Sequence, residues 1–151
     1  MRTRMKVFHR ILVPVDFHGS SRAALELAIE LAKADDAELT VMHAIEIPIY
    51  AYMNEEYPAI DPLTPLQDAA RAELAQTLSG VQRQLPAARG ELRVGSAALE
   101  ILAAIEDVHA DLVVIGTHGR HGLGRVVLGS VAEKVVRLSP APVLTVRNHP
   151  V

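Results

Sequence analysis

Short apolar runs alternate with amphipathic stretches along this chain, and that alternation limits the possible fold more than any other feature. The stretches repeat apolar residues at helical spacing, as in Leu25, Ala28 and Ile29, whereas the runs between them are typical of buried strands. Helices that alternate with strands favour a mainly parallel sheet with helices on both faces, joined by right-handed crossovers. We expect strands near residues 8–16, 38–46, 91–94, 112–115 and 143–147, and helices near residues 20–34, 66–85, 98–108 and 131–138.

The size and composition are those of one α/β domain. The chain has 151 residues, of which 50% are hydrophobic, and it shows no internal repeat, so we assign residues 1–151 to a single domain. The net charge of −3 gives no electrostatic reason to expect nucleic acid as a partner. The absence of cysteine excludes disulfides and thiolate chemistry. No window approaches the roughly 18 apolar residues of a spanning helix, and the basic start lacks a signal-peptide pattern. We therefore expect a soluble, cytoplasmic protein without membrane contact.

Some local features refine this outline. Pro14 falls in the first expected strand, and we place it near the strand's carboxyl end because proline cannot donate to the ladder. Ser20 or Ser21 is the expected cap of the first helix, with Asp16 as a further candidate. Residues 47–65 contain all three tyrosines and several prolines. Such a segment is too apolar for a free linker, and we expect a loop or lid there.

A glycine-rich loop follows the fourth expected strand. It begins at Gly116 and ends at Gly129, where Ser130 opens the last helix. Glycines let backbone N–H groups approach an anion closely, and a helix N-terminus adds unpaired donors and partial positive charge. The loop is therefore a candidate phosphate cradle. It is not a P-loop, because no lysine precedes the serine, and it is not a Rossmann fingerprint, because Val127 replaces the third glycine.

Three distant segments are expected to meet beside this loop. In an open parallel sheet, ligands bind beyond the carboxyl ends of the strands, where the strand order reverses. Those ends supply Asp16, residues 43–46 and the loop from Gly116. The alternation alone therefore predicts a ligand crevice at this edge of the sheet.

The glycine spacing also fits a known motif, G-x2-G-x9-G-[ST], with Gly116, Gly119, Gly129 and Ser130 in its places. It lies within five ordered blocks, which are residues 11–17 (ILVPVDF), His43 at the end of the second strand, and residues 110–120, 128–134 and 141–147. Through these blocks the chain resembles, over almost its whole length, the universal stress protein family of the ATP-binding type. His18 and His121 depart from the family pattern, because each stands where a small hydroxyl residue is usual.

The resemblance implies a sheet, a ligand and a set of contacts. The sheet would have five parallel strands in the order 3-2-1-4-5, and ATP, ADP or AMP would bind at its carboxyl edge, with Mg²⁺ or Mn²⁺ accompanying the phosphates. Asp16 and its neighbours would contact the adenosine, the backbone of Ala44 would lie against adenine, and Gly116 near the ribose. Gly119, Gly129 and Ser130 with Val131 would hold the phosphates. The expected ligand-binding residues are Pro14, Val15, Asp16, Ala44, Gly116, Thr117, His118, Gly119, Arg120, Gly129, Ser130 and Val131.

Three functions compete for this site. In the first, which we prefer, a regulatory protein of the stress response binds ATP, and partner proteins read its occupancy. In the second, the protein slowly hydrolyses ATP; Ser130 offers a metal contact and Arg120 or Arg125 positive charge, but no carboxylate stands beside them to position water. A flavin or electron-transfer module is disfavoured by the few aromatic residues, two Phe, three Tyr and no Trp. His118 and His121 lack a third ligand, so we assign no metal site.

The last strand, Val143 to Val146, is expected at a sheet edge with little charge to protect it. An exposed apolar edge favours pairing with another chain. The family resemblance implies the same arrangement, a homodimer built around this strand.

Overall fold

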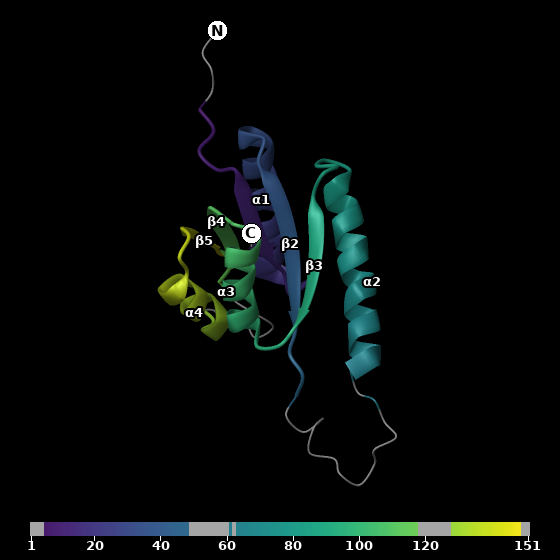
Figure 1. Cartoon of the computed structure of the whole chain (residues 1–151). Coiled ribbons are helices and arrows are strands. Elements are labelled where there is room, and N and C mark those ends of the chain that lie inside the picture. Colours follow the sequence, from purple (N-terminus) through teal and green to yellow (C-terminus); the bar gives the residue numbers. More distant parts are fainter. Residues whose placement is uncertain (1–4, 49–60, 62, 118–127, 149–151) are drawn as a thin grey trace.

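The computed structural model describes residues 5–48, 61, 63–117 and 128–148 of the chain. Strands and helices alternate through these residues (Figure 1), as the sequence pattern predicts. The strands are β1 (Arg10–Pro14), β2 (Glu38–Ile45), β3 (Arg89–Val94), β4 (Leu112–Gly116) and β5 (Val143–Val146). The helices are α1 (Gly19–Asp35), α2 (Leu63–Gln82), α3 (Ala97–Asp107) and α4 (Ser130–Leu138).

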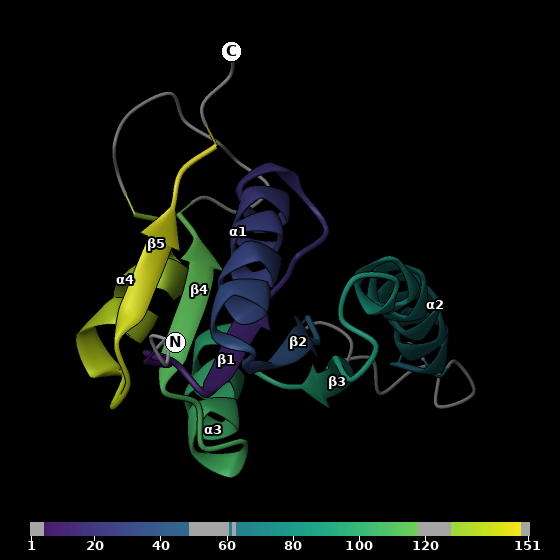
Figure 2. The ribbon, with the colours of Figure 1, turned by 90° about the horizontal axis from the view of Figure 1, so that it is seen from above.

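The five strands form one parallel sheet in the order β3-β2-β1-β4-β5, which confirms the predicted order. The strands follow one another in this order across Figure 2. From β1 the chain first adds strands on one side and then returns to add β4 and β5 on the other. The strand order therefore reverses between β1 and β4, the position at which open parallel sheets bind ligands.

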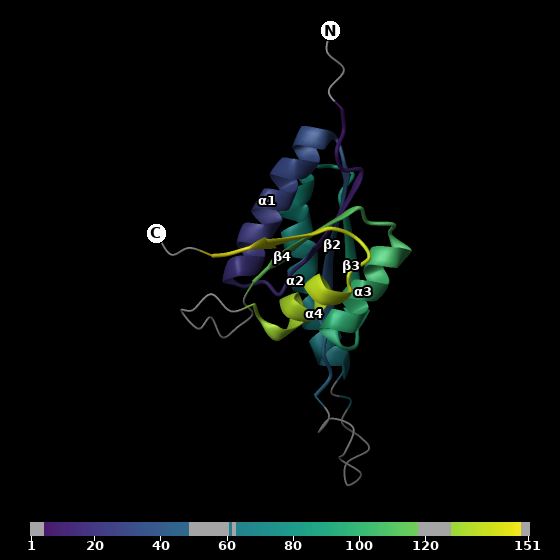
Figure 3. The same cartoon turned by 90° about the vertical axis from the view of Figure 1, so that its left-hand side faces the viewer.

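Two apolar cores cover the two faces of the sheet. On one face, Val13 and Val41 pack with residues of α1 and α2, such as Ala28 and Leu74. On the other face, the alternate strand residues, such as Met42, pack with residues of α3 and α4. Figure 3 shows α1 and the α3–α4 pair on opposite sides of the sheet. Because both faces are buried, the central strands are nearly continuous apolar runs.

The helix starts differ from two predictions. Helix α1 begins at Gly19 with His18 in the N-cap position and no side-chain cap bond, so Ser20 and Ser21 lie inside the helix and do not cap it. Helix α2 begins at Leu63, three residues before the expected start, and ends at Gln82, so Leu85 follows the helix and packs from the turn beyond it.

Within the described parts of the chain, no helix is long and apolar enough to cross a membrane. Most of the expected lid, residues 47–65, lies outside the described residues.

Pro14 explains why β1 and β4 separate at their carboxyl ends. Backbone groups of successive strand residues point to opposite neighbours, and the N–H of Val15 donates to Met42 O on β2 at 2.8 Å. Pro14 therefore faces β4, where it has no N–H to offer. Pairing between these strands stops at Leu12 and Val113. The proline lies at the last residue of β1, as predicted, and beyond it the sheet opens.

Candidate functional site

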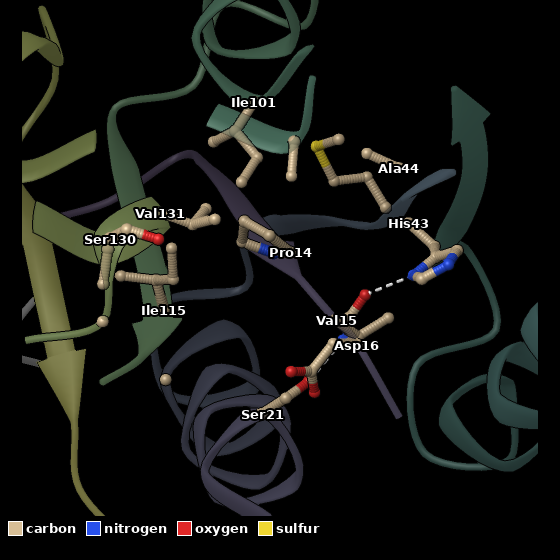
Figure 4. Close-up of a pocket in the computed structure, with 15 residues that line it drawn as sticks. Pro14, Val15, Asp16, Ser21, His43, Ala44, Ile101, Ile115, Ser130 and Val131 are labelled. Atoms are coloured by element: carbon tan, nitrogen blue, oxygen red, sulfur yellow. Dashed lines mark hydrogen bonds between the residues drawn. The ribbon is translucent and has the colours of Figure 1, made fainter. Parts of the chain in front are cut away.

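A hollow lies beyond the carboxyl ends of β1, β2 and β4, where the sheet opens (Figure 4). It spans about 720 Å³, including the part open to solvent. Its wall is largely apolar, with polar groups near Asp16, at the backbone of Ala44 and near Ser130. The lining residues are Pro14, Val15, Asp16, Ser21, Met42, His43, Ala44, Ala97, Ile101, Ile115, Gly116, Gly129, Ser130, Val131 and Ala132.

The turn after β1 places the Asp16 carboxylate at the rim of the hollow. The N–H of Asp16 donates to Ser21 Oγ at 2.9 Å, and the carboxylate Oδ1 accepts the His18 N–H at 3.0 Å. Phe17 between them has a positive φ of 67°, which is uncommon for a residue with a side chain. The chain therefore turns sharply here, and Asp16 is half-buried beside the first turn of α1.

Ala44 brings backbone polar groups to the hollow. The carbonyl of Met42 points toward β1, where it accepts the N–H of Val15, and the carbonyl of Ile45 points the other way, where it accepts the N–H of Gly95. Because strand residues alternate, the N–H and C=O of Ala44 point to the side of β1. Pairing with β1 ends at Pro14 and Met42, so Ala44 presents one donor and one acceptor beyond the end of that strand.

His43 is held between β1 and the turn that follows it. Its Nδ1 lies 2.7 Å from the carbonyl oxygen of Val15, and a carbonyl can only accept, so Nδ1 carries the proton. The ring also packs against Phe17, with 4.6 Å between the ring centroids and 38° between the planes. The sequence places His43 at the end of the second strand, beside the expected crevice, but predicts no partner for its side chain. Its bond to Val15 joins residues 28 positions apart, which no sequence spacing reveals.

The start of α3 forms a wall that the sequence does not predict. Ala97 and Ile101 line the hollow from this helix. Glu46, just after β2, accepts the N–H of Ala97 at 2.9 Å and so satisfies one of the unpaired donors of the helix N-terminus. The order of elements gives one indication of this wall, because the helix after β3 must cross the sheet near the end of β2. The residue that faces the ligand could not be read from helical spacing alone.

The start of α4 supplies the donors opposite Asp16. Gly129 is the N-cap, and its own N–H donates to the carbonyl of Thr117 at 2.6 Å. The donors without an intrahelical partner at this helix start are therefore the N–H groups of Ser130, Val131 and Ala132, beside the Ser130 hydroxyl. These groups and the positive end of the helix dipole suit an anion.

Most of the predicted contact residues converge on the hollow. Pro14, Val15, Asp16, Ala44, Gly116, Gly129, Ser130 and Val131 all line it. Thr117 is buried and does not line it; its backbone joins β5 to the start of α4, since its N–H donates to Val146 O and its carbonyl accepts from Gly129. The predictions for His118, Gly119 and Arg120 lie outside the described residues. Among the residues that the structure places, no cluster of three His, Asp or Glu side chains is arranged to hold a metal ion.

Comparison with known proteins decides the family. The family model described as "Universal stress protein family" matches residues 8–147. The chain belongs to the universal stress protein family. A universal stress protein of Thermus aquaticus is 36% identical over 143 residues, which are 93% of this chain and 100% of the relative. One from Methanocaldococcus jannaschii is 30% identical over 152 residues, which are 98% of this chain and 87% of the relative.

Solved structures of the family share the fold. The universal stress protein UspA from Lactobacillus plantarum is 29% identical with a TM-score of 0.79, and the match covers 92% of this chain and 97% of that one. Two more distant universal stress proteins are described as complexes with nucleotides. One is bound to cAMP (23% identical, TM-score 0.69, covering 94% and 98%). The other, from Archaeoglobus fulgidus, is bound to dAMP (19% identical, TM-score 0.63, covering 94% and 99%).

Proposed function

We propose that this universal stress protein binds ATP in the hollow at the carboxyl edge of its sheet and acts as a cytoplasmic regulatory protein of the stress response. The observation that carries the proposal is the distribution of polar groups around the hollow. A donor and an acceptor of Ala44 lie at one end, and the N-terminus of α4 with Ser130 lies at the other. Between them the wall is apolar, as the flat face of a base requires.

The site suits each part of an adenine nucleotide. Adenine presents a ring-nitrogen acceptor beside an amino donor, which complements the adjacent N–H and C=O of Ala44. The Asp16 carboxylate at the rim is an acceptor for ribose hydroxyls. Phosphate oxygens require donors, and the first turn of α4 supplies three backbone N–H groups and a hydroxyl. The distant relatives that hold cAMP and dAMP support the same ligand class.

A binding role suits this site better than efficient hydrolysis. Phosphoryl transfer needs a positioned water and groups that neutralise the γ-phosphate. At the start of α4 the described acidic side chain in the first turn is Glu133, which does not line the hollow. Mg²⁺ or Mn²⁺ would arrive with the nucleotide, and the Ser130 hydroxyl is the group in this wall suited to contact it. Slow hydrolysis dependent on such a metal is the alternative function.

A direct experiment tests the ligand. We expect an adenine nucleotide to be released when the purified protein is denatured, and mass spectrometry would identify it. We also expect ATP to raise the melting temperature of protein stripped of ligand. The proposal fails if nothing is released and if neither ATP nor AMP changes the melting temperature.

A matched pair of variants tests the phosphate end. Ser130→Ala removes the hydroxyl that lines the hollow, whereas Ser79→Ala removes an exposed hydroxyl on α2. We expect Ser130→Ala to weaken ATP binding about tenfold, as the loss of a hydrogen bond to a charged group does, and Ser79→Ala to leave it unchanged. Equal affinities in the two variants would place the phosphates elsewhere.

Turnover separates the two functions. With Mg²⁺ or Mn²⁺ and saturating ATP, we expect phosphate release far below the typical enzyme rate of about 10 s⁻¹. A rate near that value, reduced in Ser130→Ala, would establish the hydrolase instead.

We also propose that the protein forms a homodimer, and that this assembly reports nucleotide occupancy. The edge of the sheet supports the homodimer. In the described part of the chain, β5 pairs with β4 alone. Exposed apolar side chains lie on β5 and at the end of α4, where Leu144, Val136 and Leu138 are 37%, 43% and 51% exposed. Such an edge favours pairing with a second copy of the chain.

A further inference from the structure

The end of β1 lacks a hydrogen bond that a regular sheet would make. After the bond from Val15 N–H to Met42 O, the next bond of a parallel ladder would run from Ala44 N–H to Val15 O. The pairing of β1 with β2 stops one step earlier, at Pro14 and Met42. If both the N–H and the carbonyl of Val15 bonded to β2, the two strands would pair for one more step, between Val15 and His43.

The carbonyl of Val15 is occupied by the side chain of His43 instead. Nδ1 of the ring lies 2.7 Å from this oxygen, and Figure 4 shows the bond at the border of the hollow. The ring packs against Phe17, which has a positive φ of 67°. His43 thus satisfies the carbonyl that would otherwise accept the Ala44 N–H.

We propose that His43 is a positioning residue of the nucleotide site: by donating to the Val15 carbonyl, it keeps the Ala44 N–H available to the base of a bound nucleotide. It acts through the backbone and does not need to contact the base. Pro14 has the matching effect on the other side of β1, where its missing N–H ends the pairing with β4. Pro14 thereby ends the pairing of β1 with β4 after Leu12, and His43 ends its pairing with β2 after Pro14.

Without the imidazole donor, the chain has a competing arrangement. The N–H of Ala44 can then pair with Val15 O and extend the ladder by one step. The free protein would lose little stability, because one hydrogen bond replaces another. A base would have to break the new bond before it could bind, so affinity would fall for the nucleotide and remain unchanged for phosphates alone.

The proposal rests on the proposed nucleotide function, but its first test requires no nucleotide. His43→Phe keeps a ring against Phe17 and removes the donor, whereas His43→Asn keeps a side-chain N–H close to the position of Nδ1. We expect amide hydrogen exchange at Ala44 in ligand-free protein, measured by NMR, to slow about five- to tenfold in the Phe variant. In the Asn variant it should remain as in the wild type. His43→Leu replaces the Phe variant if that variant does not fold.

The second test compares ATP with tripolyphosphate by titration calorimetry. We expect His43→Phe to bind ATP about tenfold more weakly and tripolyphosphate as tightly as the wild type does, and His43→Asn to restore ATP binding. Unchanged Ala44 exchange in the Phe variant, or equal losses for ATP and tripolyphosphate, would overturn the role of His43. Wild-type protein that binds neither compound would overturn the proposed function, whereas the exchange result would still decide how His43 acts on the backbone.

Discussion

Gly116, at the end of β4, lies against the backbone of Ser20 in the first turn of α1. A Cβ atom on Gly116 would stand 2.6 Å from the carbonyl carbon and from Oγ of Ser20, and 2.7 Å from the amide nitrogen of Ser21. Cβ atoms in proteins essentially never lie this close to other heavy atoms, so a side chain here would force β4 and α1 apart. The first glycine of the family motif therefore has a packing role as well as its proposed position near the ribose.

Gly116→Ala is expected to destabilise the protein in the absence of any ligand. The cost should be about 1–3 kcal/mol, as for other substitutions that overfill a packed site, because the contact is with backbone that cannot move aside. Gly80→Ala is the matched control, since a Cβ there meets nothing within 4 Å. In the interior of α2 that change should stabilise by about 0.5–1 kcal/mol. Urea unfolding of both variants measures the difference, and equal stabilities would contradict the packing role.

The sequence predicts the fold well because the signals that define it are local and repeated. Buried parallel strands are apolar runs, and helices between them repeat apolar residues at helical spacing. The sequence does not predict the start of α2, because Pro62 and Pro65 are typical of loops. Pro65 lies in the first turn of the helix, where an N–H is not needed and proline is tolerated.

The sequence predicts only part of the site. It predicts the residues whose place follows from chain order, and it misses those whose place depends on contacts between distant elements. Residues at strand ends and in the glycine motif, such as Asp16 and Ser130, are placed by chain order alone. Ile101 and the bond between His43 and Val15 depend on how distant elements pack, which the sequence does not state. The family resemblance places Gly129 among the phosphate contacts, and in the structure its N–H donates to the carbonyl of Thr117.

Arg93 is expected to stabilise the helix that walls the hollow. Its guanidinium on β3 contacts three carboxylates, those of Glu91 (2.9 Å), Asp107 (2.7 Å) and Glu100 (3.6 Å), and its side chain is only 15% exposed. Burial lowers the pKa of Arg93, but the bonds to Asp107 and Glu91 outweigh this, so the pKa is raised and the group stays charged. Arg93→Met should cost about 2–3 kcal/mol near neutral pH, because three carboxylates lose their counter-charge.

A second substitution should recover part of the stability that Arg93→Met loses. Glu91→Gln in the Arg93→Met background removes one of the repelling charges and should recover part of the stability, whereas Glu91→Gln alone should destabilise. Denaturant unfolding of the four proteins gives the coupling. Strictly additive effects would show that the two groups do not stabilise one another.

Asp61 is expected to titrate below the ordinary range. The hydroxyl of Thr64 donates to its carboxylate, and the N–H groups of Leu63 and Thr64 donate to Oδ1 at 2.9 and 3.3 Å. These bonds, the first of them the largest cause, lower its pKa from the ordinary value of 3.8. A group with a depressed folded pKa stabilises the fold above its unfolded pKa, and that contribution is lost as the pH falls through the folded value.

The ionised Asp61 carboxylate should therefore stabilise the first turn of α2 at neutral pH, and this stabilisation should be lost only in strong acid. Carboxyl ¹³C shifts followed during an acid titration would give the pKa of Asp61 directly. Thr64→Val removes the hydroxyl donor and should move this pKa back toward 3.8. An Asp61 that titrates at or above its ordinary value in the wild type, or one that Thr64→Val does not affect, would exclude the hydrogen bonds as the cause.

Thr145 offers a selective test of the proposed dimer. The N–H of Val113 donates to Pro142 O, and that of Thr117 to Val146 O, so even-numbered residues of β5 direct their backbone groups to β4. Thr145 directs its own groups away from the sheet. Thr145→Pro removes only the outward N–H, and proline is tolerated on an edge strand. We expect this variant to sediment as a monomer with unchanged helix content by circular dichroism, whereas Thr145→Val, which keeps the N–H, should sediment as the wild-type dimer. If all three proteins share one sedimentation coefficient, the outward edge of β5 is not the dimer contact.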